Sequence, residues 1–318
     1  MPSFALTKWL WDGPTHSMNA IIYFMDYLFS VVGVLLGVAF FTLIERKVIG
    51  LIHYRKGPNK VLVWGLTQPI SDALKLLTKE FPKFSSYKII IYYRGPRVSI
   101  ILILLCWGWY DFCFNTGASS IKIIVILRVI SLTAYGFLLT RWGSNSKYAL
   151  LGGHRAVAQI ISYEVCLILF LLVVIYVTKT FSIESLKEIQ SKLWFAAYSI
   201  PLFLSWVILC IAEANRTPFD LAEGESEIVS GFNIEYGGGL FAFIFIREYG
   251  IIIFLRFLTV VFFIGATRIL VKTFLICALF VWVRCAFPRV RYDNLIIMAW
   301  KVALPYRIGI ILLSTCLA

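Results

Sequence analysis

The stretch VAQIISYEVCLILFLLVVIYVT, residues 157–178, decides the fold class of this sequence. Beyond Glu164 it contains no charged residue, and it is rich in Leu, Ile and Val. A helix of about 20 apolar residues crosses the hydrocarbon core of a bilayer, which is about 30 Å thick. The stretch therefore predicts a transmembrane helix with one acid inside it.

Similar apolar runs recur along the whole chain of 318 residues. Hydrophobic residues make up 60% of the sequence and charged residues only 15%, which lies outside the composition of soluble domains. We predict an all-α, polytopic integral membrane protein that forms a single transmembrane domain over residues 1–318, with about eight transmembrane helices and short amphipathic helices on the inner side. The predicted spans are 21–44, 98–114, 121–140, 157–178, 194–212, 240–265, 269–287 and 294–317. Seven spans is the alternative, because the second is short and Lys301, Pro305 and Arg307 interrupt the last.

The formal net charge of +13 is unevenly distributed over the predicted loops. The loops that join odd-numbered spans to the following even-numbered spans carry most Lys and Arg, so the positive-inside rule places them on the cytoplasmic or matrix side. That side then holds an inner loop at 52–97 and an acidic inner loop at 213–239. Residues 1–20 predict an interfacial segment rather than a signal or transit peptide. The positive charge favours anionic lipids and acidic protein partners, whereas the absence of a soluble basic domain in the sequence argues against nucleic acid.

Metal and nucleotide chemistry have little support in the sequence. The seven cysteines and three histidines lack the paired spacing of a zinc or iron-sulfur site. The glycine run at 237–239 begins a predicted span, which suits close helix packing better than phosphate binding. We therefore predict that this chain holds no metal.

Two acids lie in or just before the first inner loop, among its basic residues. Glu45 and Arg46 follow the first apolar run, and an acid this close to hydrocarbon is expected to face a protein interior or a hydrated cavity. Residues 69–80 predict a short amphipathic helix lying in the interface, since Ile70 and Leu74 share one face. Asp72, an acid within a basic loop, is expected to have a partner.

Two predicted spans contain acids. Glu164 lies inside the fourth, where a charge costs about 2.5 to 3.5 kcal/mol on insertion scales, so it indicates a buried or functional group. The sixth carries Arg247 and Glu248. Adjacent helical positions point about 100° apart, so these two side chains are expected to have separate partners.

The stretch EANRTPFDLAEGESE, residues 213–227, concentrates acids in a basic protein. Thr217 can cap a helix that has Pro218 at its first position and Asp220 at its third. Repulsion between acids three or four residues apart would destabilise such a helix by about 0.2 to 0.5 kcal/mol per pair. Interleaved apolar residues favour a buried helix over a solvated loop, and burial with mutual repulsion would raise the pKa values of these carboxyls until they exchange protons near neutral pH.

Five segments together resemble a known family. They are ERKVIGLIHYRKGPNK (45–60), QPISDALKLLTKE (68–80), SNSKYALLGGHRAVAQIISYE (144–164), AEANRTPFDLAEGESEIVSGFNIEY (212–236) and FPRVRYDNLI (287–296). In this order they resemble the chain 1 family of NADH-ubiquinone oxidoreductase, respiratory complex I, over roughly residues 30–310. The resemblance implies an eight-helix membrane subunit of the mitochondrial inner membrane, or less readily of a bacterial plasma membrane.

The resemblance also implies roles and partners. The family forms a quinone-access tunnel and chamber with two soluble subunits, contacts neighbouring membrane-arm subunits and anionic lipids such as cardiolipin, and binds ubiquinone as substrate. It implies no metal, flavin or iron-sulfur cluster on this chain, which is not catalytic alone. The implied quinone-chamber residues are Glu45, Arg46, Asp220, Phe232 and Arg291. The implied proton-path residues are Asp72, Glu164, Glu213, Glu223, Glu225, Glu227 and Glu248.

The sequence departs from the family at Arg247, where a small residue is usual, at His154, where an aliphatic residue is usual, and in a long N-terminal extension. Three alternatives remain from the residues alone. They are a stand-alone proton-coupled transporter or channel, a structural anchor, and the equivalent subunit of a membrane-bound hydrogenase.

Overall fold

The fold is known from a computed structural model that describes residues 13–80, 88–108, 122–192, 194–220, 235–265 and 267–317. Throughout these ranges the regular structure is helical, without strands. The helices are α2 (Gly13–Ile52), α3 (Gln68–Thr78), α4 (Ile89–Gly108), α5 (Lys122–Ser144), α6 (Lys147–Thr178), α7 (Ile183–Lys192), α8 (Phe195–Tyr198), α9 (Ile200–Glu213), α11 (Gly238–Thr259), α12 (Ile269–Ala286), α13 (Tyr292–Ile297) and α14 (Leu304–Leu317). Short 3₁₀ and π segments lie at Val63–Gly65, Val260–Ile264 and Met298–Ala303.

Seven helices within the described ranges are long and apolar enough to cross a membrane. The fifth predicted span is divided between α8 and α9, which separate at Ser199, two residues before Pro201. The 14 residues of α9 rise about 21 Å, which is short of a full hydrocarbon core. The prediction of an all-α polytopic membrane protein is confirmed, with one of its eight spans present as this shorter helix.

Several helix ends differ from the predicted span boundaries. α2 continues to Ile52, so Glu45 and Arg46 lie inside the helix rather than after it. α4 begins at Ile89 and includes Pro96, although residues up to 97 were predicted as loop. Hydropathy marks the segment that lies in hydrocarbon, whereas a helix can continue into the polar region with its backbone fully hydrogen-bonded.

The last span shows how an interrupted apolar run stays helical. A π segment at Met298–Ala303 contains Lys301 and joins α13 to α14 just before Pro305. A proline removes one backbone donor and crowds the preceding turn, and a π segment is one way to accommodate such a change. The C-terminal helices therefore follow one continuous path.

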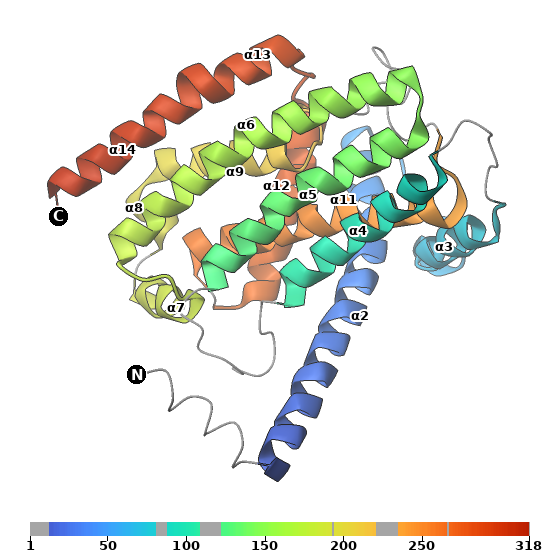
Figure 1. Ribbon diagram of the computed structural model, residues 1–318, viewed down its shortest axis with the longest axis horizontal. Helices are drawn as coiled ribbons and strands as arrows, with labels where there is room; N and C mark the ends of the chain where they lie inside the picture. The colour runs from blue at the N-terminus through green and yellow to red at the C-terminus, as the bar shows by residue number, and fades with distance from the viewer. Residues whose placement is uncertain are drawn as a thin grey trace.

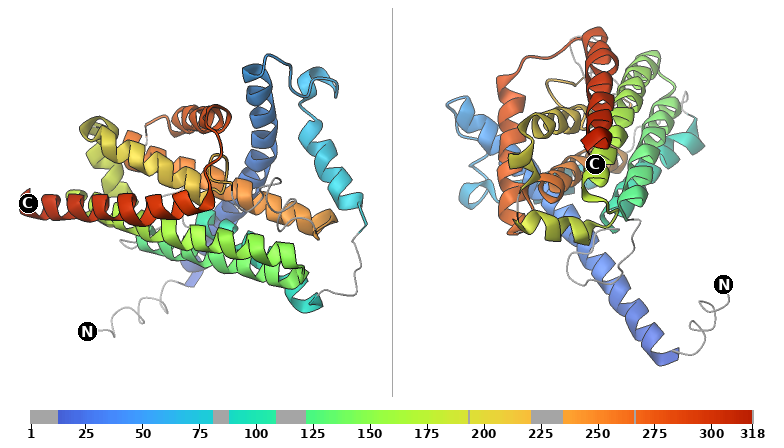
Figure 2. Two further views of the ribbon diagram at one scale, coloured as in Figure 1. Left: turned by 90° about the horizontal axis from the view of Figure 1, so that it is seen from above. Right: turned by 90° about the vertical axis from the view of Figure 1, so that its left-hand side faces the viewer.

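Close packing joins α4, α5 and α6, whose axes run side by side in Figure 1. A Cβ atom on Gly95 would lie 2.7 Å from the backbone nitrogen of Thr140, and one on Gly143 would lie 2.7 Å from Tyr92. Only glycine allows α4 and α5 to approach this closely. α14 lies along α6 in both Figure 1 and Figure 2.

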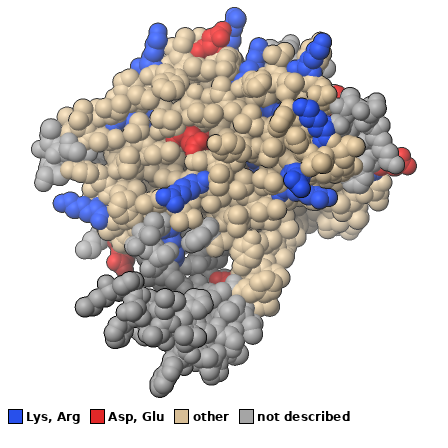
Figure 3. Space-filling view, viewed as in Figure 1, with Lys and Arg blue, Asp and Glu red and all other residues tan. Residues whose placement is uncertain are grey.

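α11 is the central helix for the candidate site, since it contacts α2, α3, α4, α9 and α12. By contrast, the N-terminal half of α2 extends away from the bundle (Figures 1 and 2). Its side chains include Phe24 and Phe29, which are exposed. The surface seen in Figure 3 is mostly uncharged, with Lys and Arg more numerous than acids.

Candidate functional site

Glu45 is buried between three helices and has direct partners on two of them. The hydroxyl of Tyr249 on α11 donates a hydrogen bond to Glu45 Oε2 over 2.9 Å. The guanidinium of Arg284 on α12 donates to Glu45 Oε1 and forms an ion pair with it. We call Glu45, Tyr249 and Arg284 the Glu45 cluster. The expectation that Glu45 faces a protein interior is confirmed, since only 5% of the surface of Glu45 is exposed.

Arg216 extends this cluster towards Glu248. Its guanidinium carbon lies 4.6 Å from the centre of the Tyr249 ring, which is the range of a cation–π interaction. Its Nη2 atom is 3.9 Å from Glu248 Oε2. Arg216 also interacts electrostatically with Glu45. One arginine thus lies between the acid of α2 and the acid of α11.

Arg247 and Glu248 diverge as predicted. Glu248 pairs with Arg216, whereas the guanidinium carbon of Arg247 lies 3.3 Å from the ring centre of Phe137 on α5. Arg247 interacts electrostatically with Glu213, at the end of α9. Both Arg247 and Glu213 are 3% exposed.

Glu213 has fewer direct contacts than Glu45. Its Oε2 atom is buried and receives no hydrogen bond from any described residue. Its electrostatic neighbours are Glu164 on α6 and Arg247 on α11. We call Glu164, Glu213 and Arg247 the Glu213 cluster. Glu164 itself is partly buried, and its expected role as a buried or functional acid stays a prediction.

The segment that follows α9 is held by side chains from other helices. Gln159 on α6 donates from Nε2 to the carbonyls of Ala212 (2.8 Å) and Phe219 (3.0 Å). The backbone N–H of Val290 donates to the Pro218 carbonyl over 2.9 Å. These bonds occupy backbone carbonyls of the segment, which forms turns instead of a helix. The predicted helix start at Thr217 and Pro218 is therefore wrong for the described residues up to Asp220.

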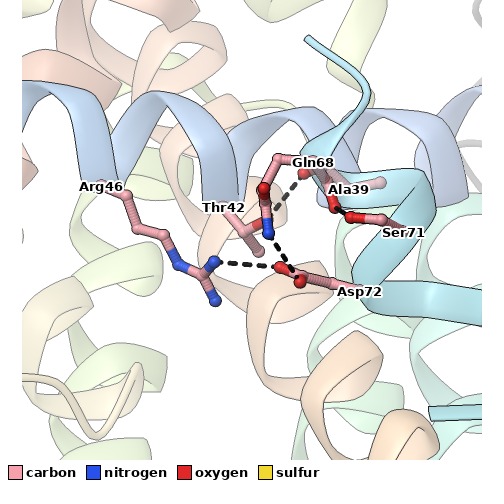
Figure 4. Close-up of polar contacts among 6 residues, drawn as sticks. All are labelled: Ala39, Thr42, Arg46, Gln68, Ser71 and Asp72. Atoms are coloured by element: carbon pink, nitrogen blue, oxygen red, sulfur yellow. Dashed lines mark hydrogen bonds and ion pairs between the residues drawn. The ribbon is translucent and has the colours of Figure 1, made fainter. Parts of the chain in front are cut away.

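A separate, more exposed pair joins α2 to α3. Arg46 Nη1 donates to Asp72 Oδ2 over 2.9 Å, and Gln68 Nε2 donates to Asp72 Oδ1 over 2.9 Å (Figure 4). The expected partner of Asp72 is therefore Arg46. Arg46 and Glu45 are adjacent in sequence but belong to different contacts, and the apolar side chains Ile70 and Leu74 of α3 remain exposed.

Arg291 does not join the buried acids. Its side chain is mostly exposed and pairs with Asp293 over 3.2 Å. Arg284 and Tyr249, which do contact Glu45, were not among the predicted site residues. No sequence pattern singles out either residue, because Arg284 is one of many cations on the predicted inner side and Tyr249 is one of many aromatic residues in the predicted spans. The remaining predicted residues Glu223, Glu225, Glu227 and Phe232 lie outside the described residues.

Metal ligands do not gather in the part of the chain that is described. Within it, no group of three or more His, Cys, Asp or Glu side chains could hold a metal ion. The expectation that this chain carries no metal, flavin or iron-sulfur cluster stays a prediction.

Long apolar helices that enclose paired acids and arginines define a polytopic membrane protein with buried charges in its interior. The profile of the NADH dehydrogenase family matches residues 25–315. The chain belongs to this family, within the group of NADH-ubiquinone oxidoreductase chain 1 proteins.

Curated relatives match over nearly their whole length. NADH-ubiquinone oxidoreductase chain 1 of Aedes aegypti is 47% identical over 294 residues, covering 88% of this chain and 93% of the relative. The protein of the same name from Paracentrotus lividus is 44% identical, with 90% and 94% covered. That of Oncorhynchus mykiss is 42% identical, with 94% of each covered.

Proposed function

We propose that this chain is the membrane subunit of proton-pumping NADH:ubiquinone oxidoreductase that forms the quinone-access tunnel and begins an acidic proton path. The observation that carries the proposal is the buried charge series that leads from Arg284 and Glu45 through Arg216 and Glu248 to Arg247 and Glu213. Buried charges are costly and are retained in membrane segments mainly where ions, protons or substrates move. The names of the relatives supply the reaction.

The proposed tunnel mouth lies where α2, α3 and α11 meet. A quinone has a long apolar tail and a small polar head, so it needs an apolar entrance and a polar inner end. The exposed apolar face of α3 suits the entrance, and the Glu45 cluster suits the polar end. Arg46 and Asp72 would hold α3 at this entrance, with Asp220, Phe232 and Arg291 further along the chamber.

The proposed coupling starts from the charge on the quinone head. Reduction changes the local charge and hydration beside the Glu45 cluster, and Arg216 would respond because it interacts with both Glu45 and Glu248. Protons would then pass among the carboxyls of the proton path, for which we keep the predicted set. This set is Asp72, Glu164, Glu213, Glu223, Glu225, Glu227 and Glu248.

The proposed surroundings follow from the same role. The chain would work in the mitochondrial inner membrane with the soluble quinone-site subunits and the neighbouring membrane-arm subunits, without a redox centre of its own. An anionic phospholipid would bind in a pocket of about 430 Å³ at the α5–α6 turn, lined by Leu139, Trp142, Leu150 and others. The ammonium of Lys88 lies 4.5 Å from the ring centre of Trp142, which lines this mainly apolar pocket, so an anionic headgroup could pair with Lys88 while the acyl chains fill the pocket.

One experiment separates this proposal from a stand-alone transporter. Membranes are solubilised gently, the large NADH dehydrogenase is isolated, and the preparation is irradiated with a photoreactive quinone analogue. We expect the chain to migrate with the rotenone-sensitive enzyme and to be labelled near α2, α3 or α11, and excess quinone should prevent labelling. A chain that migrates alone and remains unlabelled would overturn the proposal and favour the transporter.

A further inference from the structure

Arg256 is a buried cation in an apolar part of α11. It lies in the stretch IIIFLRFLTVVFF, residues 251–263, and only 4% of its surface is exposed. A charge inside a membrane segment is costly and usually pairs with an acid or with backbone carbonyls. In the described structure, however, the Nε and Nη1 atoms of Arg256 have no acceptor, and the polar group beside it is the thiol of Cys277 on α12. The contacts that hold this arginine are therefore of another kind.

Two aromatic rings from different helices contact the guanidinium. The guanidinium carbon of Arg256 lies 4.5 Å from the ring centre of Phe41 on α2 and 4.9 Å from that of Phe280 on α12. Both distances are within the range of a cation–π interaction, which is stronger where water is excluded. Both rings are buried. One side chain of α11 thus binds two other helices through its charge.

The two rings lie one helical turn from the Glu45 cluster. Phe41 is four residues before Glu45 on α2, and Phe280 is four residues before Arg284 on α12. Residues four apart share one face of a helix. The Phe41 ring also packs edge-on against the ring of Tyr249, with 6.0 Å between the ring centres. The rings therefore form a layer beside the Glu45 cluster and touch it through Tyr249.

The Glu45 cluster depends on how the same three helices are placed. Glu45 belongs to α2, Tyr249 to α11 and Arg284 to α12, so each of its hydrogen bonds crosses between helices. A shift of α2 or α12 along α11 would separate the acid from its donors. Arg256 opposes such a shift, because a guanidinium attracts a ring appreciably only within about 6 Å of the ring centre.

We propose that Arg256 is a positioning residue for quinone binding. It holds α2 and α12 on α11 through Phe41 and Phe280, a contact that we call the Arg256 clamp, and so keeps the Glu45 cluster in the arrangement that receives the quinone head. This inference rests on the proposed function, in which the cluster is the polar end of the quinone tunnel. Without the clamp the competent arrangement is populated for only part of the time, and the apparent affinity for quinone falls by that fraction. Bound quinone restores the arrangement, so the KM rises while kcat changes little.

The stability of the protein should respond differently from the KM. Removing a buried charge also removes the cost of taking it out of water, so an apolar side chain of similar length can replace a poorly compensated arginine with little loss. Arg256→Met should therefore leave the yield of assembled enzyme and its unfolding temperature nearly unchanged. A role confined to packing would do the opposite, lowering stability without changing the KM.

The test compares five variants of the assembled enzyme. Arg256→Met removes the cation and Arg256→Lys keeps it, whereas Phe280→Leu removes one ring and Phe280→Tyr keeps an aromatic face. Arg307→Met is the matched control, since Arg307 is also buried but donates to the Ala303 carbonyl over 2.9 Å. The KM and kcat are measured with NADH and decylubiquinone at equal enzyme content, and unfolding temperatures are recorded on the same preparations.

We expect the KM for decylubiquinone to rise about 3- to 10-fold in Arg256→Met, about 2- to 5-fold in Phe280→Leu, and less in Arg256→Lys and Phe280→Tyr. The kcat should stay within about two-fold of wild type in all four. Arg307→Met should leave the KM unchanged. Adding Phe280→Leu to Arg256→Met should have little further effect, because the cation that this ring contacts is already gone.

An unchanged KM in Arg256→Met would overturn the inference, and so would a rise in KM that Arg307→Met reproduces. A double variant in which the two effects multiply would show that Arg256 and Phe280 act independently, which also contradicts the clamp. If Arg256→Met does not assemble, equal KM values in Phe280→Leu and Phe280→Tyr would overturn the inference instead.

The proposed function has its own readout in the same assay. Glu45→Gln removes the charge at the proposed polar end of the tunnel, so wild-type KM and turnover in this variant would contradict that part of the proposed function. Impaired quinone reduction in Glu45→Gln together with an unchanged KM in Arg256→Met would contradict only the clamp. The two failures are therefore distinguishable.

Discussion

The Glu45 cluster and the Glu213 cluster bury the same kind of side chain in different ways. Glu45 is bound by the hydroxyl of Tyr249 and the guanidinium of Arg284, so both of its oxygens have donors. Glu213 is at least as buried, yet its Oε2 has no donor among the described residues. A carboxylate held by two donors is fixed as an ion, whereas one with an unfilled acceptor position can gain a proton or a water molecule.

From this difference we expect different roles for Glu45 and Glu213, although the sequence alone does not distinguish them. The Glu45 cluster joins α2, α11 and α12 and presents a constant charge at the proposed polar end of the quinone tunnel. The Glu213 cluster lies where α6, α9 and α11 meet, and in the proposed function it changes its protonation. The following changes test that contrast, beginning with the largest expected effect.

Removing Arg284 should damage the protein most. Arg284→Leu leaves Glu45 buried without the arginine that contacts it directly, and breaking a buried pair in this way costs about 3 to 5 kcal/mol. We expect little assembled enzyme, measured by native electrophoresis and by thermal stability of the remainder. The double variant Glu45→Gln with Arg284→Leu should recover part of the loss, and equal loss in both would show that Arg284 acts independently of Glu45.

Removing the Tyr249 hydroxyl should have a smaller effect of the same kind. Tyr249→Phe deletes one hydrogen bond to a charged acceptor, which is worth about 1.5 to 3 kcal/mol, and keeps the ring on which Arg216 lies. The assembled enzyme should unfold at a lower temperature but remain detectable. Phe41→Leu is a control that removes a neighbouring ring without touching the acid. An unchanged unfolding temperature in Tyr249→Phe would contradict the account in which donors bind both oxygens of Glu45.

The pair between Arg46 and Asp72 should matter least for stability. Both side chains are substantially exposed, and exposed pairs contribute about 0.2 to 1 kcal/mol. We expect Asp72→Asn to leave assembly and unfolding temperature nearly unchanged, at both low and high salt. A loss comparable with that of Arg284→Leu would show that α3 depends on this contact far more than its exposure indicates.

The apolar runs predicted the spans because a bilayer imposes long hydrophobic helices, and Asp72 was correctly expected to have a partner. Helix ends were less predictable, since α2 and α6 continue beyond their apolar stretches. Glu45 and Arg284 are 239 residues apart, so no local pattern could pair them. The turn at Thr217 to Asp220 depends on Gln159 from α6, which competes with the helical hydrogen bonds expected from the local sequence.

The central claim is that Glu213 moves protons while Glu45 stays charged, and the proton yield per NADH oxidised by Glu213→Gln tests it most directly. The variant enzyme is reconstituted into proteoliposomes and compared with wild type at equal enzyme content. We predict normal assembly, because glutamine fits the site without a charge, and proton translocation reduced about 10-fold or more. Wild-type proton yield and wild-type quinone reduction in Glu213→Gln would contradict the account.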